Sequence, residues 1–266
     1  MPFIPHTADD TAGVDLGGGR LIKNTLFDEI PAELRSGVLQ HTPPGIGEME
    51  MLRLMGARAA QDAAGICFLG AGSYDHHIPA AVWDLAARGE FMTAYTPYQA
   101  EASQGTLQLI YEYQSMMTGL TGLDVSNASV YDGASGLAEA VLMTLRATRR
   151  ARSRRVLVAG TVPPHSRSAA GSIVGNQGVE LVELPMGADG RIDPAVIDRD
   201  PDAVALVVQQ PNFFGSLEDV DALTDRAHAH GMLVVAVVNP LSLAVLKPPG
   251  EWGAQGADIA CGDGQP

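Results

Sequence analysis

Short runs of almost wholly apolar, β-branched residues recur through the second half of the chain. They span residues 156–160, 179–184, 203–209 and 233–238, and a further run begins at Ala257. Runs of this length and composition are typical of strands buried on both faces of a parallel sheet. Helical segments lie between them. This alternation predicts an α/β protein with a mainly parallel sheet flanked by helices.

Apolar positions at helical spacing predict the helices. One helix is expected before the glycines 119 and 122, which close it, and its face consists of Leu107, Ile110, Tyr111, Gln114 and Met117. A second follows the small-residue loop Tyr131–Gly136, with Leu137, Val141, Leu142 and Leu145 on its face. Further helices are predicted over Glu48–Ala64, from Pro79 to Arg88, and from a capping box at Ser216–Asp219 to a stop at Gly231.

The first 47 residues differ from the rest, because they are rich in Gly, Pro and Thr and contain only short helical pieces. We therefore predict an N-terminal arm over residues 1–47 and one large domain over residues 48–266. The glycines at 17–19 follow no strand and open no helix at the dinucleotide-binding spacing, so they are interpreted as a flexible turn.

Composition narrows the classes of function. The net charge of −14 over 266 residues argues against nucleic acid and anionic membranes as partners. Cys67 and Cys261 lack any metal-binding spacing and are predicted to be buried free thiols. Residues 1–5 do not resemble a secretory signal, and the longest apolar run, Met232–Val238, is too short to span a bilayer. We expect a soluble, cytoplasmic protein.

The loop Tyr131–Gly136 is a candidate for anion binding. Small residues that enter a helix expose N–H groups at the positive end of its dipole, which suits an anion. The same pattern is also typical of an ordinary glycine-rich helix start. Ser135 lacks the context of a hydrolase nucleophile, and His76 and His77 have no partner at ligand spacing, so no metal site is predicted. The five arginines within residues 149–155 are interpreted as a solvated helix end.

Four segments resemble one family of enzymes. They read AYTPYQAEASQGTLQ from Ala94, TGLDVSNASVYDGASGLAEA from Thr121, FLGAGSYDHHIPAAV from Phe68 and FDEIPAELR from Phe27. This chain is similar to the P-protein of the glycine cleavage system, and more closely to subunit 1 of its two-subunit form. The resemblance implies the large domain of a fold type I pyridoxal-phosphate (PLP) transferase with an N-terminal helical arm. It also implies a further small C-terminal domain that this chain lacks.

The resemblance further implies a glycine decarboxylase, an oxidoreductase that passes an aminomethyl group from glycine to the lipoyl arm of a carrier protein. Such chemistry requires a lysine that binds PLP and an acid at its ring nitrogen. The family's aspartate matches Asn239 and its lysine matches Pro266, while Lys23 and Lys247 lie elsewhere. No catalytic or cofactor-binding residue is therefore expected in this chain, and PLP is expected on a lysine-bearing partner subunit. A non-catalytic structural or regulatory paralogue is the alternative.

Ligands of a parallel sheet bind at the carboxyl ends of its strands. The loops expected there are 131–136, 162–167, 210–215, 239–242 and 262–266. The resemblance implies that the aromatic turn stiffened by Pro97 faces the partner's active site, or else it covers the next helix. His165 matches a position where related enzymes stack a ring on PLP, and it is interpreted here as structural. The partner-facing candidates are Tyr95, Thr96, Tyr98, Gln99, Asp132 and Asn212.

Overall fold

The computed structural model describes residues 43–62, 75–92, 96–148 and 153–264, together with residues 31, 33, 41, 65, 66, 68, 70 and 72. The chain forms two compact units, residues 1–68 and 69–266. In the first unit the described helix is α2, Glu48–Ala59, which ends before the predicted Ala64. Its predicted apolar face is exposed, since Met51 and Met55 are 40% and 50% accessible. The predicted arm lies almost wholly outside the described residues, so its boundary at residue 47 stays a prediction.

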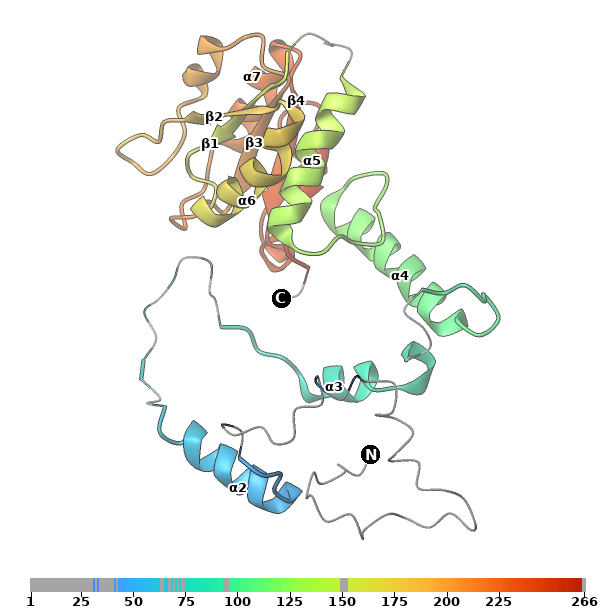
Figure 1. Cartoon of the computed structure of the whole chain (residues 1–266). Coiled ribbons are helices and arrows are strands. Elements are labelled where there is room, and N and C mark those ends of the chain that lie inside the picture. Colours follow the sequence, from blue (N-terminus) through green and yellow to red (C-terminus); the bar gives the residue numbers. More distant parts are fainter. Residues whose placement is uncertain are drawn as a thin grey trace. The chain divides into compact units, whose positions relative to one another are not determined.

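Five parallel strands form the sheet of the second unit (Figure 1). They run in the order β2-β1-β3-β4-β5. Their bounds are Arg155–Ala159 for β1, Glu180–Leu184 for β2, Ala205–Gln210 for β3, Leu233–Val238 for β4 and Ile259–Cys261 for β5. The predicted parallel strands are confirmed, with ends shifted by a residue or two.

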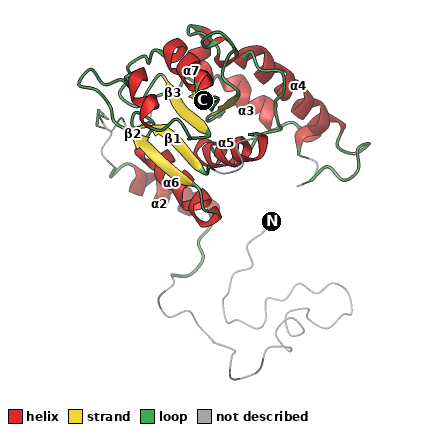
Figure 2. Cartoon of the chain, turned by 90° about the horizontal axis from the view of Figure 1, so that it is seen from above, coloured by secondary structure: helices red, strands yellow, loops and turns green. Residues whose placement is uncertain are grey.

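Helices cover both faces of this sheet, as Figures 1 and 2 show. α5 (Gly133–Ala147) and α6 (Pro164–Val174) pack together on one face, and α7 (Val220–Ala229) packs on the other against β3 and β4. The central strands carry apolar side chains on both faces of the sheet because helices cover both faces. Fully buried side chains of this core include Leu137, Leu157, Leu206, Leu223 and Val234. Each such side chain contributes about 1.5–3 kcal/mol by its burial.

The second unit also contains one long helix and several short ones. They are α3 (Ala80–Ala86), η2 (Gly89–Phe91), α4 (Gln104–Thr121), η3 (Gly175–Gln177), η4 (Pro194–Arg199), η5 (Pro240–Ala244) and η6 (Pro249–Glu251). α4 confirms the predicted helix, although Gly119 lies inside it and Gly122 alone closes it, with φ of 71°. Within the described ranges, no helix combines the length and the apolarity needed to cross a membrane.

The predicted capping box of α7 is wrong. Asp219 is the N-cap, and its carboxylate accepts from the Ala222 N–H at 3.1 Å. In the predicted box Ser216 would be the N-cap and Asp219 the third helical residue, whereas Asp219 is itself the cap and its neighbour Glu218 is buried. The helix therefore begins three residues later than the capping box predicted.

The predicted solvated helix end at residues 149–155 is also wrong where it can be seen. Residues 149–152 lie outside the described ranges, but Arg155 is the first residue of β1. Its guanidinium pairs with Glu180 at 3.3 Å and with Asp200 at 3.0 Å. Similarly, the predicted loop over residues 162–167 is short, because α6 begins at Pro164. Proline suits this position, since the first helical N–H has no intrahelical partner.

Candidate functional site at the carboxyl edge of the sheet

The carboxyl ends of the strands meet at one edge of the sheet, because all five strands run in the same direction. α5 also begins there, beside the end of β5: a Cβ added at Gly136 would lie 3.8 Å from the Cβ of Cys261. α6 begins shortly after β1, and Asn239 follows β4 directly. The fold therefore gathers several of the predicted loops where parallel sheets bind their ligands.

Two carboxylates occupy the start of α5. Asp132 is its N-cap, and Oδ1 accepts from the Ser135 N–H at 2.7 Å. Asp263, which follows β5, accepts from the Gly133 N–H through its own Oδ1, also at 2.7 Å. The N–H groups that were predicted to suit an anion are thus bonded to side chains of the same chain. Sequence reasoning missed Asp263, and the only signal for it was its place between two glycines just after a strand.

The surroundings shift the pKa values of two groups at this edge. Hydrogen bonds from Ser135, helped by the Ala134 N–H and the charge of His165, lower the pKa of Asp132 below its usual range. Burial, and then the nearby charge of Asp263, raise the pKa of the Cys261 thiol to about 12. The Asp132 carboxylate is therefore held in its charged form, and the Cys261 thiol in its neutral form.

Asn239 closes the end of β4. Its side-chain oxygen accepts from the Leu241 N–H at 3.0 Å and caps the 3-10 helix η5. His165 lies in the first turn of α6 and is exposed. Lys247, expected as a solvated side chain, is instead paired: its Nζ donates to Asp221 at 2.9 Å. The amide of Asn239 and the amine of Lys247 thus both serve the local fold.

Asn212 lies in a buried turn after β3. Its Nδ2 donates to the Gly190 carbonyl and to Glu218 Oε1, both at 2.8 Å, and its Oδ1 accepts from the N–H groups of Phe214 and Ser216. The side chain is 2% exposed. This geometry agrees with a role in shaping the turn, and its assignment as a partner-facing residue stays a prediction.

The turn around Pro97 precedes α4. The Tyr98 N–H donates to the Thr96 carbonyl at 2.8 Å, which confirms a tight turn at the proline. Thr96 is partly buried, Gln99 is exposed, and Tyr98 is 90% accessible. The ring of Tyr98 therefore does not cover the start of α4 within the described chain. Tyr95 and Pro266 lie outside the described residues.

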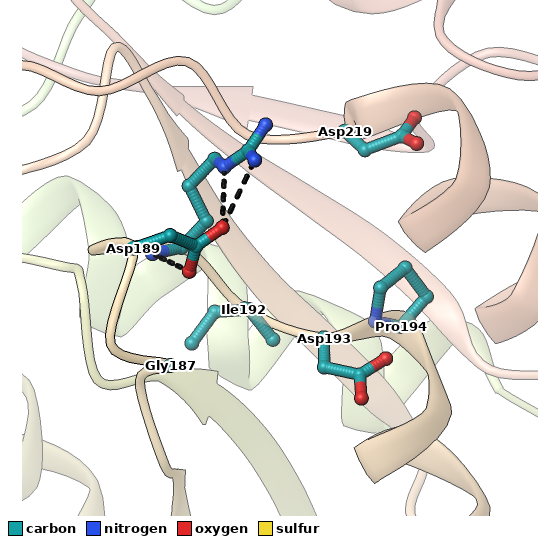
Figure 3. A pocket seen from close by; sticks show the side chains of 7 residues that line it. Gly187, Asp189, Ile192, Asp193, Pro194 and Asp219 are labelled. Atoms are coloured by element: carbon teal, nitrogen blue, oxygen red, sulfur yellow. Dashed lines mark hydrogen bonds and ion pairs between the residues drawn. The ribbon is translucent and has the colours of Figure 1, made fainter.

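A shallow depression of about 300 Å³ lies between the loop after β2 and the start of α7 (Figure 3). Three of its lining side chains are aspartates, but each has a local partner. Asp189 is paired with Arg191, Asp193 accepts from the Ala195 N–H, and Asp219 caps α7. The hydrogen bonds of Arg191 lower the pKa of Asp189. These carboxylates stabilise the loop and the two helix starts.

Comparison with known proteins identifies the family. The model of the glycine cleavage system P-protein matches residues 3–266. The chain belongs to this family. It is similar to the probable glycine dehydrogenase (decarboxylating) subunit 1 of Thioalkalivibrio sulfidiphilus, with 61% identity over 269 residues, and to that of Nitrosomonas europaea, with 59% identity. The whole chain is covered in both comparisons, together with 60% and 59% of the relatives' own lengths.

Solved structures agree with the P-protein assignment. A crystal structure of glycine decarboxylase (P-protein) in inhibitor-bound form matches with a TM-score of 0.79 and 43% identity, over 100% of this chain and 59% of that one. A sphingosine-1-phosphate lyase from Burkholderia pseudomallei matches with a TM-score of 0.56 and 15% identity, over 78% of this chain and 51% of that one, and shows the fold alone. The predicted PLP-transferase fold is confirmed, and this chain spans about three-fifths of its relatives' length.

Membership in the P-protein family implies PLP as a cofactor of the enzyme. That group needs a lysine, an acid at its ring nitrogen and N–H donors for its phosphate. Lys247 is the only lysine among the described residues, and it is paired with Asp221. Asn239, at the position of the acid, carries a neutral amide that caps η5, and the Gly133 N–H already donates to Asp263. The residues present in the described part of the chain do not fit this cofactor.

Proposed function

We propose that this chain is the subunit of glycine decarboxylase that carries no PLP lysine, acting with a lysine-bearing partner subunit. The observation that supports the proposal most strongly is the start of α5, where carboxylates of this chain take the N–H groups that a phosphate would need. The relatives that are 55–61% identical carry the name of subunit 1, which itself implies a second subunit.

In this proposal, the partner's PLP supplies the chemistry by which glycine loses carbon dioxide and its aminomethyl group passes to a lipoylated carrier protein. This chain supplies the folded frame and part of the wall of the partner's pocket. The proposed wall residues are Tyr95, Thr96, Tyr98, Gln99, Asp132 and Asn212. Of these, Tyr98 presents its ring and hydroxyl to solvent most openly among the described residues. A polar-tipped aromatic ring suits a subunit interface.

The proposal is tested by reconstitution. This chain, a lysine-bearing P-protein subunit and a lipoylated carrier protein are mixed, and the exchange of labelled carbon dioxide into glycine is measured. We expect exchange in the complete mixture and none with either subunit alone. Exchange catalysed by this chain alone would contradict the division of labour, and a silent mixture containing a competent partner would favour the structural or regulatory paralogue.

The location of the cofactor is tested separately. The chain is incubated with PLP, reduced with borohydride and mapped by peptide mass spectrometry. Because Lys247 is held by Asp221, we expect only scattered trace labelling. A stoichiometric pyridoxyl adduct on Lys247 would overturn the assignment of the cofactor to the partner.

A further inference from the structure

The first turn of α5 has the donors of an anion site, but they are already in use. The first N–H groups of a helix have no intrahelical partners, and with the helix dipole they attract anions such as phosphate. In α5, the Gly133 N–H donates to Asp263 and the Ser135 N–H donates to Asp132, both at 2.7 Å. Asp263 is 130 residues away from Gly133 in sequence, so the tertiary fold brings this carboxylate to the helix.

Two glycines hold the Asp263 carboxylate in place. A Cβ at Gly262 would collide with the carbonyl oxygen of Val238, so the chain after β5 lies directly against the end of β4. A Cβ at Gly133 would lie 2.9 Å from the carboxylate atoms of Asp263. Glycine at position 262 therefore leaves room for the loop to pass the end of β4, and glycine at position 133 leaves room for the Asp263 carboxylate. The hydrogen bond between Asp263 and Gly133 depends on the absence of a side chain at both positions.

We propose that Asp263 is an internal counter-anion that fills the anion site of α5 and closes it to phosphate and phosphate esters. The carboxylate satisfies the Gly133 N–H and supplies the negative charge that the helix dipole favours. A phosphate that approached would have to displace Asp263 and would lie beside the charged Asp132. Removal of the Asp263 side chain should therefore open a phosphate site in this chain. This inference does not depend on the proposed role in glycine decarboxylation.

The test uses inorganic phosphate and the 266-residue chain labelled with nitrogen-15. The amide signal of Gly133 is followed during a phosphate titration at constant ionic strength, which separates specific binding from screening. In the native chain we expect this signal to stay in place. In Asp263→Ala we expect a saturable shift of the Gly133 signal, with phosphate bound at least about ten-fold more tightly than by the native chain.

Two control variants separate occupancy from charge. Asp189→Asn removes one negative charge at an exposed aspartate that is paired with Arg191, and it should bind phosphate no better than the native chain. Asp263→Asn keeps an oxygen that accepts from Gly133, so it should bind phosphate more weakly than Asp263→Ala.

Three outcomes overturn the proposal. The first is equal phosphate affinity in Asp263→Ala and the native chain. The second is an equal gain in affinity in Asp189→Asn, which would assign the effect to net charge. The third needs no variant: a saturable shift of the Gly133 signal in the native chain would show that its N–H is open to phosphate.

Discussion

At the scale of single residues, the most informative side chain is Glu218. It is 5% exposed, and its two oxygens accept from Thr161 Oγ1 at 2.7 Å, Asn212 Nδ2 at 2.8 Å and the Ile192 N–H at 2.9 Å. Its own N–H donates to Gln210. One carboxylate thus links the loops after β1, β2 and β3. A buried carboxylate is costly unless it is hydrogen-bonded, so these contacts are needed once the side chain is in the core.

Replacement of Glu218 by alanine should therefore strongly destabilise the chain. The change opens a cavity and removes the acceptor of the Thr161 hydroxyl, the Ile192 N–H and one N–H of Asn212. We therefore expect the free energy of unfolding in urea to fall by at least about 2 kcal/mol. Glu139→Ala, at an exposed position of α5, should change it by no more than about 0.5 kcal/mol. Equal effects of the two substitutions would show that the Glu218 network contributes nothing to stability.

At the scale of elements, the ends of the helices are fixed by contacts as much as by local sequence. α4 continues through Gly119, which has nothing within 4 Å of a Cβ position, and stops at Gly122 with φ of 71°. Gly250 of η6 lies so close to Gly122 that a Cβ on Gly250 would collide with the Gly122 carbonyl oxygen. The end of α4 is thus joined to η6 by a close approach between two glycines.

Replacement by alanine should have opposite effects on stability at Gly119, inside α4, and at Gly122, which ends it. Gly119→Ala should stabilise the chain by about 0.5–1 kcal/mol, because alanine loses less backbone entropy in an exposed helix interior. Gly122→Ala should destabilise it by about 1–2 kcal/mol, because a Cβ is strained in the left-handed region. Thermal or urea unfolding of the pair is the measurement. A stabilising Gly122→Ala would contradict this assignment of the helix end.

At the scale of the whole molecule, the second unit buries its apolar side chains around the sheet, whereas many apolar side chains in the residues that precede α5 in sequence are exposed. Large apolar and aromatic side chains in residues 83–116 remain accessible, with Trp83 at 68%, Tyr98 at 90% and Tyr111 at 74%. Large exposed apolar groups of this kind mark surfaces that another protein segment covers. This agrees with the proposal that the turn at Pro97 faces a partner subunit.

Tyr98 separates an interface role from internal packing. Because its ring is 90% exposed, Tyr98→Ala should change the free energy of unfolding of this chain by no more than about 0.5 kcal/mol. Tyr98→Phe should reduce glycine exchange in the reconstituted complex by roughly ten-fold or more, about 1.4 kcal/mol of barrier, if the hydroxyl contacts the partner's site. Full exchange with Tyr98→Phe, together with a loss of about 3 kcal/mol in Tyr98→Ala, would remove this turn from the proposed pocket.

The sequence by itself determined the strands, the helices α4, α5 and α7, and the class of fold. Runs such as Leu233–Val238 are apolar at every position and rich in β-branched residues, and they alternate with helical segments, which predicted a parallel sheet covered on both faces. The glycine and small-residue pattern before Leu137 likewise predicted α5, although the helix begins at Gly133, inside the predicted loop. These features depend on interactions between near neighbours in sequence.

The tertiary structure alone decided how the candidate site is filled. The loop at Tyr131–Gly136 has the pattern of an anion site, and nothing near it in sequence shows that Asp263 takes the Gly133 N–H. Glu218 likewise gives no local sign that its carboxylate accepts from Thr161 and from the Ile192 N–H. Both outcomes depend on pairs that are distant in sequence. A hydrogen-bonding group takes the partner that folding brings within reach, and local pattern cannot encode that choice.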